Sequence, residues 1–386
     1  MDMQTASSQS TPITMDAKLG ALYKLWVVNI LLNIITLGIY SFWGKTRVRR
    51  YVVSCFKLVD DRFEFTGTGK EIFLAFLKAL IFLILISIPL FLAVYDTLKV
   101  QEEQSELIAK MEEVKEQMQA LEAKEQVTEA EVQHYQALKK EEKEISNLVF
   151  QHVLSDHMPA FIVIMLYYFF YLLYLPFVAK FGVMHYLTGH LRWRGIRGDL
   201  QGSAFLYGLY AVLHTLLVIL TLGLWLPVAQ VKLMKYKQNR LYFGSQKGEY
   251  VSGQLGSLFL SHILTLLLFI PTLSLSRFWY RARLARMHMS CFRLNGLLFE
   301  STITGWGLLK LKLLNFLILI FTLGIGYPIV LKRNVRFFAK NILIIGNIQA
   351  FETEQAQGTP PKTGTGISHW LDVGANFKSG YMVLNF

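Results

Sequence analysis

The stretch TLGIYSFWGKTRVRRY, residues 36–51, decides how this chain is interpreted, because it recurs three more times without a gap. The other copies are TLGLWLPVAQVKLMKY at 221–236, TLSLSRFWYRARLARM at 272–287 and TLGIGYPIVLKRNVRF at 322–337. Each copy follows an apolar run and ends in a cluster of cations. Self-similarity of this kind indicates internal duplication. The chain is therefore predicted to be built from repeats, with residues 175–179 as a fifth, degraded copy.

The four clear copies predict one shared backbone path. An apolar helix ends near the Thr-Leu-Gly or Thr-Leu-Ser, where glycine favours a break. An amphipathic basic helix then lies along the lipid headgroups. Short strand-like pieces follow the repeats at 63–65, 241–243, 297–299 and 342–345.

Long apolar runs place the protein in a membrane. Of the 386 residues 53% are hydrophobic and only 17% are charged. Six apolar runs have the length that crosses about 30 Å of hydrocarbon: residues 21–42, 72–95, 158–179, 203–229, 255–275 and 307–331. A large soluble helical protein is the alternative.

These patterns predict an all-α membrane protein. It would be a polytopic helical bundle of about six spans built from internal repeats, with basic interfacial helices, short strand-like pieces and an inserted soluble helical hairpin. The predicted segments are a disordered tail at 1–18, a membrane repeat unit with the first two spans at 19–96, an acidic hairpin at 97–150, a membrane domain with further repeats at 151–348 and a polar tail at 349–386. No cleavable signal peptide is predicted.

The hairpin at 97–150 differs from the rest of the chain. Residues 101–144 hold 13 Glu and 6 Lys, whereas the whole chain has a net charge of +12. Met111, Val114, Met118 and Leu121 follow a heptad seam. Residues 128–131 have the form of a capping box that would begin a second helix, with Val132, Tyr135, Leu138, Ile145 and Leu148 on its apolar face. The hairpin is either a solvated rod or a docking surface for a partner protein or a second copy.

Cations beside the apolar runs are the candidate ligands of anionic lipid headgroups. They are Lys45, Arg47, Arg49, Arg50, Lys232, Lys235, Arg281, Arg283, Arg286, Lys332, Arg333 and Arg336. Nucleic acid is not expected as a partner, because these cations adjoin hydrocarbon-soluble sequence.

The membrane topology follows from the same cations. We predict six single crossings, with the first motif cytoplasmic and the hairpin periplasmic. Lys232 and Lys235 would then face outward, against the charge bias. The alternative is a re-entrant pair of half-helices broken at the Thr-Leu-Gly, whose backbone other helices must bury.

Polar residues inside the apolar runs are further candidates: His214, His262, Asn29, Asn33 and Asn315. They either bond neighbouring helices or line a solute path. Neither histidine has a companion at metal-ligand spacing, so no metal is predicted. No catalytic motif and no cofactor motif stands out, and the protein is not expected to be an enzyme. The glycines of residues 66–69 lack the rest of a phosphate-loop motif.

The two cysteines, Cys55 and Cys291, occupy matched repeat positions. Two cysteines are too few for a disulfide framework. They are interpreted as small buried thiols, with a redox bridge between repeats as the alternative.

TLGIYSFWGKTRVRRY followed by FEFTGTGKE resembles the signature of the YjgN-like family of bacterial multipass inner-membrane proteins. The resemblance covers most of residues 19–350. It implies a location in the bacterial inner membrane and an uncharacterised activity, and it supplies no catalytic residues. Ser274 departs from the motif, and the hairpin at 97–150 is an insertion relative to it.

Two hypotheses on function stay open. The first is transport or channelling of a small solute, because repeated units with interrupted spans build the central site of many transporters. The second is a non-catalytic membrane or envelope scaffold, in which the basic modules bind anionic lipid and the acidic hairpin recruits a partner. Polar residues inside the spans favour transport, and their scarcity favours the scaffold. Transport or channelling is the preferred hypothesis at this point, and the scaffold is the alternative.

Overall fold

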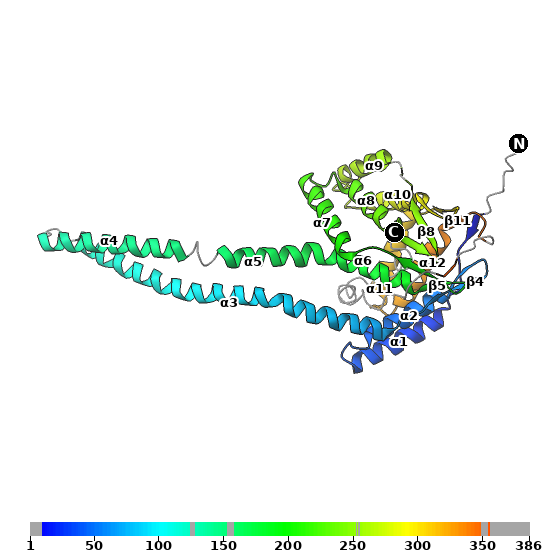
Figure 1. Ribbon diagram of the computed structural model, residues 1–386, viewed down its shortest axis with the longest axis horizontal. Helices are drawn as coiled ribbons and strands as arrows, with labels where there is room; N and C mark the ends of the chain where they lie inside the picture. Colours follow the sequence, from blue (N-terminus) through cyan, green and yellow to red (C-terminus); the bar gives the residue numbers. More distant parts are fainter. Residues whose placement is uncertain are drawn as a thin grey trace. The chain divides into compact units, whose positions relative to one another are not determined.

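The computed structural model of the protein describes residues 10–123, 128–152, 158–251, 253, 255–348 and 354–355. Of the predicted tails, residues 10–18 are described, whereas the C-terminal tail lies outside the described residues except for 354–355. The chain divides into two compact units, Met1–Ala79 with Tyr174–Phe386, and Leu80–Leu173. Figure 1 shows the elements of both.

The first unit contains an antiparallel sheet of eleven strands, which corrects the all-α prediction. Its strands are β1 Ser10–Pro12, β2 Thr14–Met15, β3 Phe56–Leu58, β4 Asp61–Phe65, β5 Leu191–Trp193, β6 Ile196–Leu200, β7 Leu241–Phe243, β8 Gln246–Tyr250, β9 Phe292–Leu294, β10 Leu297–Ser301 and β11 Ile342–Ile345. The pairs β3–β4, β5–β6, β7–β8 and β9–β10 are hairpins with two-residue turns. Asn295 and Gly296 both have positive φ, as a type I′ turn requires.

The N-terminal strands join the two ends of this sheet. The strand order begins with β1 and finishes with β2, and only Ile13 separates these two strands in the chain. β1 pairs with β11, and β2 pairs with β3. The second strand of a hairpin has two neighbours in the sheet: the first strand of its own hairpin on one side and the first strand of the next hairpin on the other. β4, for example, lies between β3 and β5. Residues 10–15, predicted to be part of a tail, thus take the place of a second hairpin strand beside β11 and close a ring. We count this strand pair as the fifth hairpin, although its strands come from the two ends of the chain.

The helices repeat with the hairpins. They are α1 Leu19–Ile35, α2 Ser41–Ser54, α3 Gly69–Glu122, α4 Glu129–His152, α5 Met158–Tyr168, the π-helix η2 Phe169–Tyr174, α6 Leu175–His190, α7 Ala204–Leu220, α8 Leu226–Gln238, α9 Leu255–Leu267, α10 Arg277–Ser290, α11 Gly305–Phe321 and α12 Tyr327–Lys340. In three repeats an apolar helix, a basic helix and one hairpin follow in order; in a fourth, α11 and α12 lead to β11, which pairs with the N-terminal strand β1. The fifth uses α6 with β5 and β6, so the degraded copy is structurally a repeat.

The Thr-Leu-Gly motif turns the chain in the same way in all four clear copies. Leu37, Leu222, Leu273 and Leu323 have φ between 48° and 50°, and the next residue also has positive φ. The threonine hydroxyl donates to the carbonyl four residues earlier and accepts from the amide four residues later, as at Thr221. Thr36, Thr272 and Thr322 repeat both bonds. The prediction of one shared backbone path is confirmed. Ser274, which stands where the other three copies have glycine, adopts the same left-handed conformation with a φ of 67°.

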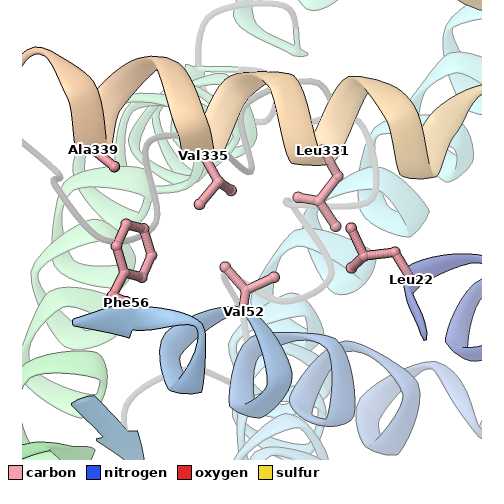
Figure 2. Close-up of a cluster of buried hydrophobic side chains, with 6 residues drawn as sticks. All are labelled: Leu22, Val52, Phe56, Leu331, Val335 and Ala339. Carbon is pink, nitrogen blue, oxygen red and sulfur yellow. The ribbon is translucent and has the colours of Figure 1, made fainter. Parts of the chain in front are cut away.

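The basic helices α2, α6, α8, α10 and α12 form a second ring. Separate apolar clusters join α12 to α2, α2 to α6, α6 to α8, α8 to α10 and α10 to α12. Figure 2 shows the first of these, where Leu331 and Val335 of α12 face Leu22 of α1 and Val52 of α2. Another cluster, which includes Trp193 and Ile344, gathers side chains from all five hairpins. The repeats therefore depend on one another for burial.

Among the described residues, two helices rather than the predicted six are long and apolar enough to cross a membrane: Gly69–Leu92 and Phe161–His190. The helices α1, α7 and α11 have 17 residues each, and α9 has 13. Each packs on the basic helix that follows it, and that helix leads back to a strand of the same sheet. The six single crossings are therefore wrong, and the re-entrant alternative agrees with these four helix pairs.

The second unit contains the predicted helical hairpin. Val114 of α3 packs against Leu138 and Ile145 of α4, with Met111, Met118 and Leu121 beside them. The Thr128 amide donates to a Glu131 carboxylate oxygen at 2.8 Å, which confirms the capping box. Val132 and Leu148 are exposed, so their assignment to the apolar face is wrong.

Candidate functional site

The repeat places two cations at the same positions of four basic helices. They follow the motif threonine by 11 and 14 residues: Arg47 and Arg50 on α2, Lys232 and Lys235 on α8, Arg283 and Arg286 on α10, and Arg333 and Arg336 on α12. We call them the cation pairs. Residues three apart share a helix face, and every member except the half-buried Arg333 is exposed. The repeat thus presents the same pair of positive charges four times.

Arginines of the cation pairs also donate hydrogen bonds to backbone carbonyls of the fold. Arg50 donates to the Gly67 carbonyl at 3.0 Å, and Arg286 donates to the Ile303 carbonyl at the matched position. These carbonyls belong to the linkers that lead from one hairpin to the next apolar helix. A guanidinium has five N–H donors, so these bonds leave donors for a ligand. The two lysines of α8 are the members best suited to testing ligand binding without disturbing a linker.

The remaining predicted headgroup ligands occupy different surroundings. Arg281 is exposed on α10, and Lys45 and Lys332 are half-buried. Arg49 is buried, with 8% of its surface exposed. Arg49 therefore does not share the accessible position of the cation pairs.

The polar residues within the apolar helices mostly bond neighbouring helices or turns. Asn29 donates to the Gly44 carbonyl at 3.1 Å, and Asn315 donates to Asn334 at 2.7 Å. The Trp225 indole donates to His214 Nδ1 at 3.1 Å. These bonds stay within one helix pair.

His262 links two repeats, because its Nε2 lies 3.0 Å from the Gly223 carbonyl in the preceding motif turn. Asn33 Oδ1 is buried without a partner among the described residues. The structure does not bring these polar residues together into one cluster. In the described part of the chain, no group of three or more His, Cys, Asp or Glu side chains could hold a metal ion.

The glycine-rich segment at 66–69 is a helix cap. The Thr68 amide donates to the Glu71 carboxylate at 3.1 Å, and the Glu71 amide donates to the Thr68 hydroxyl at 3.3 Å. This reciprocal pair is a capping box at the start of α3. It accounts for the segment without a bound phosphate.

Cys55 and Cys291 are both buried free thiols. Each follows its basic helix directly, where Cys55 caps α2 and Cys291 caps α10. Burial raises the pKa of both thiols. The redox bridge is absent, and the small-thiol interpretation agrees with the structure.

Lys237 is a buried cation that was not among the predicted headgroup ligands. It lies on the inner side of α8, with 7% of its surface exposed. Alignment of the repeats on the first strand of each hairpin would have found it. The residues four positions before those strands are Val52, Leu187, Lys237, His288 and Phe338.

The model of a family described as bacterial protein of unknown function, DUF898, matches residues 10–276 and 251–370. The first match begins at Ser10, where β1 begins. The chain belongs to this family, in agreement with the YjgN-like resemblance.

The chain also resembles a curated protein over a short stretch. The protein called inner membrane protein YjgN from Salmonella typhimurium is 37% identical over 67 residues. That match covers 17% of this chain and 16% of the relative. No solved structure matches the chain.

Proposed function

We propose that this protein is a non-catalytic scaffold of the bacterial inner membrane that binds anionic lipid headgroups through its cation pairs. The supporting observation is the motif turn of the four helix pairs. Leu37, Leu222, Leu273 and Leu323 are 93%, 91%, 86% and 92% exposed at these turns. Apolar side chains in such exposed turns favour hydrocarbon over water. The turns are the parts that enter the bilayer.

The position of the cation pairs sets the depth of insertion. Lys232 lies six residues into α8, which begins at Leu226. At 1.5 Å per residue this is about 9 Å, and the preceding turn adds roughly 5 Å. The sum is close to half of the hydrocarbon thickness of about 30 Å. With the turns in one leaflet, the cation pairs lie at the level of its phosphates.

The two long helices complete this membrane arrangement. Gly69–Leu92 has 24 residues, about 36 Å of helix, which is enough to cross the bilayer. A second crossing by Phe161–His190 returns the chain to the side from which it started, so in this proposal the protein is multi-pass. The positive-inside bias places the cation pairs in the cytoplasm and the acidic hairpin in the periplasm. The relative's name supports the inner membrane as the location.

The same observations favour a scaffold over transport. A solute path needs polar groups that face a passage. Here most of the predicted polar groups are used in bonds such as Asn315 to Asn334, and apolar side chains from all five hairpins fill a shared cluster. We infer that the acidic hairpin is the surface for a partner protein or a second copy.

Lipid retention tests the proposal. The full-length protein is purified from a bacterial membrane in mild detergent, and bound phosphatidylglycerol and cardiolipin are measured by mass spectrometry. The test variant carries Lys232→Gln and Lys235→Gln. The control carries Lys139→Gln and Lys140→Gln in α4, which changes the charge equally.

If the four cation pairs bind independently, the test variant loses about a quarter of the retained anionic lipid, because one of four equivalent sites is neutralised. The control retains the wild-type amount. Equal retention by both variants and wild type, or equal losses in both variants, would contradict headgroup binding by the cation pairs.

A further inference from the structure

The buried face of α8 carries polar groups that the headgroup sites do not use. Lys237 and Gln238 are 7% and 0% exposed, and His288 of α10 is 3% exposed. The Tyr250 hydroxyl lies 3.2 Å from His288 Nδ1. Among the described residues, neither amide atom of Gln238 has a hydrogen-bond partner. A buried amide without partners costs roughly 1–3 kcal/mol per group.

The Lys237 ammonium group has no counter-charge within the described residues. The charged or titratable groups that act on it or adjoin it are Lys180 of α6 and His288 of α10, and neither is a carboxylate. Burial, with Lys180 as a smaller cause, lowers the pKa of Lys237 to about 7. Burial also lowers the pKa of His288 to about 3, so this imidazole is neutral.

The fold does not need a cation at this position. Val52, Leu187 and Phe338 occupy the equivalent place in three other repeats, and all three pack in apolar clusters. The ring of helices therefore forms with apolar side chains there. A charge buried without a partner is strongly destabilising, so folding does not account for Lys237.

We propose that Lys237 binds a small oxyanion, a phosphate or carboxylate group, on the buried face of α8, which packs against α6 and against α10, with Gln238 and His288 supplying further hydrogen bonds. The oxyanion provides the missing negative charge. If the Tyr250 hydroxyl donates to Nδ1, the neutral imidazole carries its proton on Nε2 and donates to the ligand. The site lies on the buried face of α8, so it is independent of the cation pairs.

Anion binding must be coupled to protonation of Lys237. A bound oxyanion interacts more strongly with the ammonium form than with the neutral amine, so binding raises the pKa of this group. By linkage, affinity falls as the pH rises above the pKa of the free protein.

The pKa of Lys237 is the readout of the test. The full-length protein is labelled with 13C at lysine Cε and titrated by NMR, and the Lys237 signal is identified as the one missing from Lys237→Met. In the first arm, inorganic phosphate is added in neutral detergent. In the second arm, phosphatidylcholine nanodiscs are exchanged for phosphatidylglycerol nanodiscs without phosphate. Lys235→Met, on the exposed face of the same helix, is the control.

We expect the pKa of Lys237 to rise from about 7 to about 8 or higher, which corresponds to at least a tenfold preference of the anion for the ammonium form. A rise in the first arm assigns a free oxyanion, and a rise in the second arm alone assigns a lipid phosphate. Lys235→Met shows the same rise. A Lys237 signal that titrates identically with and without anion in both arms refutes the proposal.

Discussion

Removal of the N-terminal strands should open the ring of hairpins. The perturbation is a deletion of residues 1–16, which takes away β1 and β2, and the matched control is a deletion of residues 1–9. The deleted strands pair at Ser10, Thr11 and Pro12 with β11 and at Thr14 and Met15 with β3. Both β3 and β11 would become free edges.

The expected loss of stability follows from the number of hydrogen bonds that the deletion removes. Five residue pairs are removed, together with the bond from the Asp16 amide to the Cys55 carbonyl. An antiparallel ladder has about one hydrogen bond per residue pair, and each contributes roughly 1 kcal/mol net. The five pairs and the Asp16 bond make about six bonds, but Pro12 has no N–H and cannot donate one, so the local loss is about 5 kcal/mol. The ion pairs of Asp16 with Lys57 and Arg62 are exposed and add little.

Amide hydrogen exchange measures the opening. A loss of about 5 kcal/mol corresponds to exchange that is faster by a factor of roughly 10³–10⁴. We expect this acceleration in β3 and β11 of the longer deletion and wild-type protection in β7 and β8, which do not contact the deleted strands. A synthetic peptide of residues 10–16 should restore protection. Wild-type exchange in β3 and β11 of the longer deletion would refute the closing role of these strands.

Three further predictions concern insertion, topology and pH. Leu222→Asp should withdraw its motif turn from the hydrocarbon, because Asp instead of Leu costs about 3–4 kcal/mol at depth, while the two long helices keep the protein in the membrane. Quenching of a fluorophore on a single cysteine at Leu224 by brominated lipids measures the withdrawal, and quenching as strong as in the protein that keeps Leu222 would contradict leaflet insertion by the turns. Single cysteines introduced at Lys115 and Lys235 should differ when intact cells are labelled from outside, because only position 115 is expected to react. Labelling of both positions would show that α7 crosses the membrane and would contradict the re-entrant arrangement. Lys237→Met should stabilise the protein by about 4 kcal/mol at pH 7. The pKa of Lys237 falls from 10.5 in the unfolded chain to about 7 in the folded protein, so between pH 7 and pH 10.5 the folded wild type binds fewer protons than the unfolded chain. Wild-type stability should therefore rise from pH 7 to pH 10.5 and approach that of the variant, and a constant difference in denaturation midpoint would show that Lys237 does not titrate as inferred.

The repeated motif made the local structure predictable. Thr36 and its three counterparts supply the same side-chain bonds around each turn, and a positive φ at the third motif position suits glycine. The basic helices, the capping box at Thr128 and the seam at Val114 were predictable for the same reason. These features depend on residues that are near neighbours in the chain.

Hydropathy overestimated the number of crossings because it counts apolar residues and ignores where the chain turns. Residues 203–229 form one apolar run, but the motif turn after Leu220 ends α7 and α8 returns to the sheet. The candidate residues were similarly ambiguous. His262 was recognised as a polar residue in an apolar run, but its partner, the Gly223 carbonyl, lies in the preceding repeat.

The sequence by itself determined the repeats, the motif turns, the cation pairs and the acidic hairpin, because each is a pattern of residues at short, regular spacing. Only the tertiary structure decided that the hairpins form one ring and that residues 10–15 close it. Those three- and two-residue strands carry almost no periodic signal, and a strand forms when its backbone groups find partners far away in the chain. The burial of Lys237 was likewise decided by packing of α6, α8 and α10, which no local pattern in α8 reports.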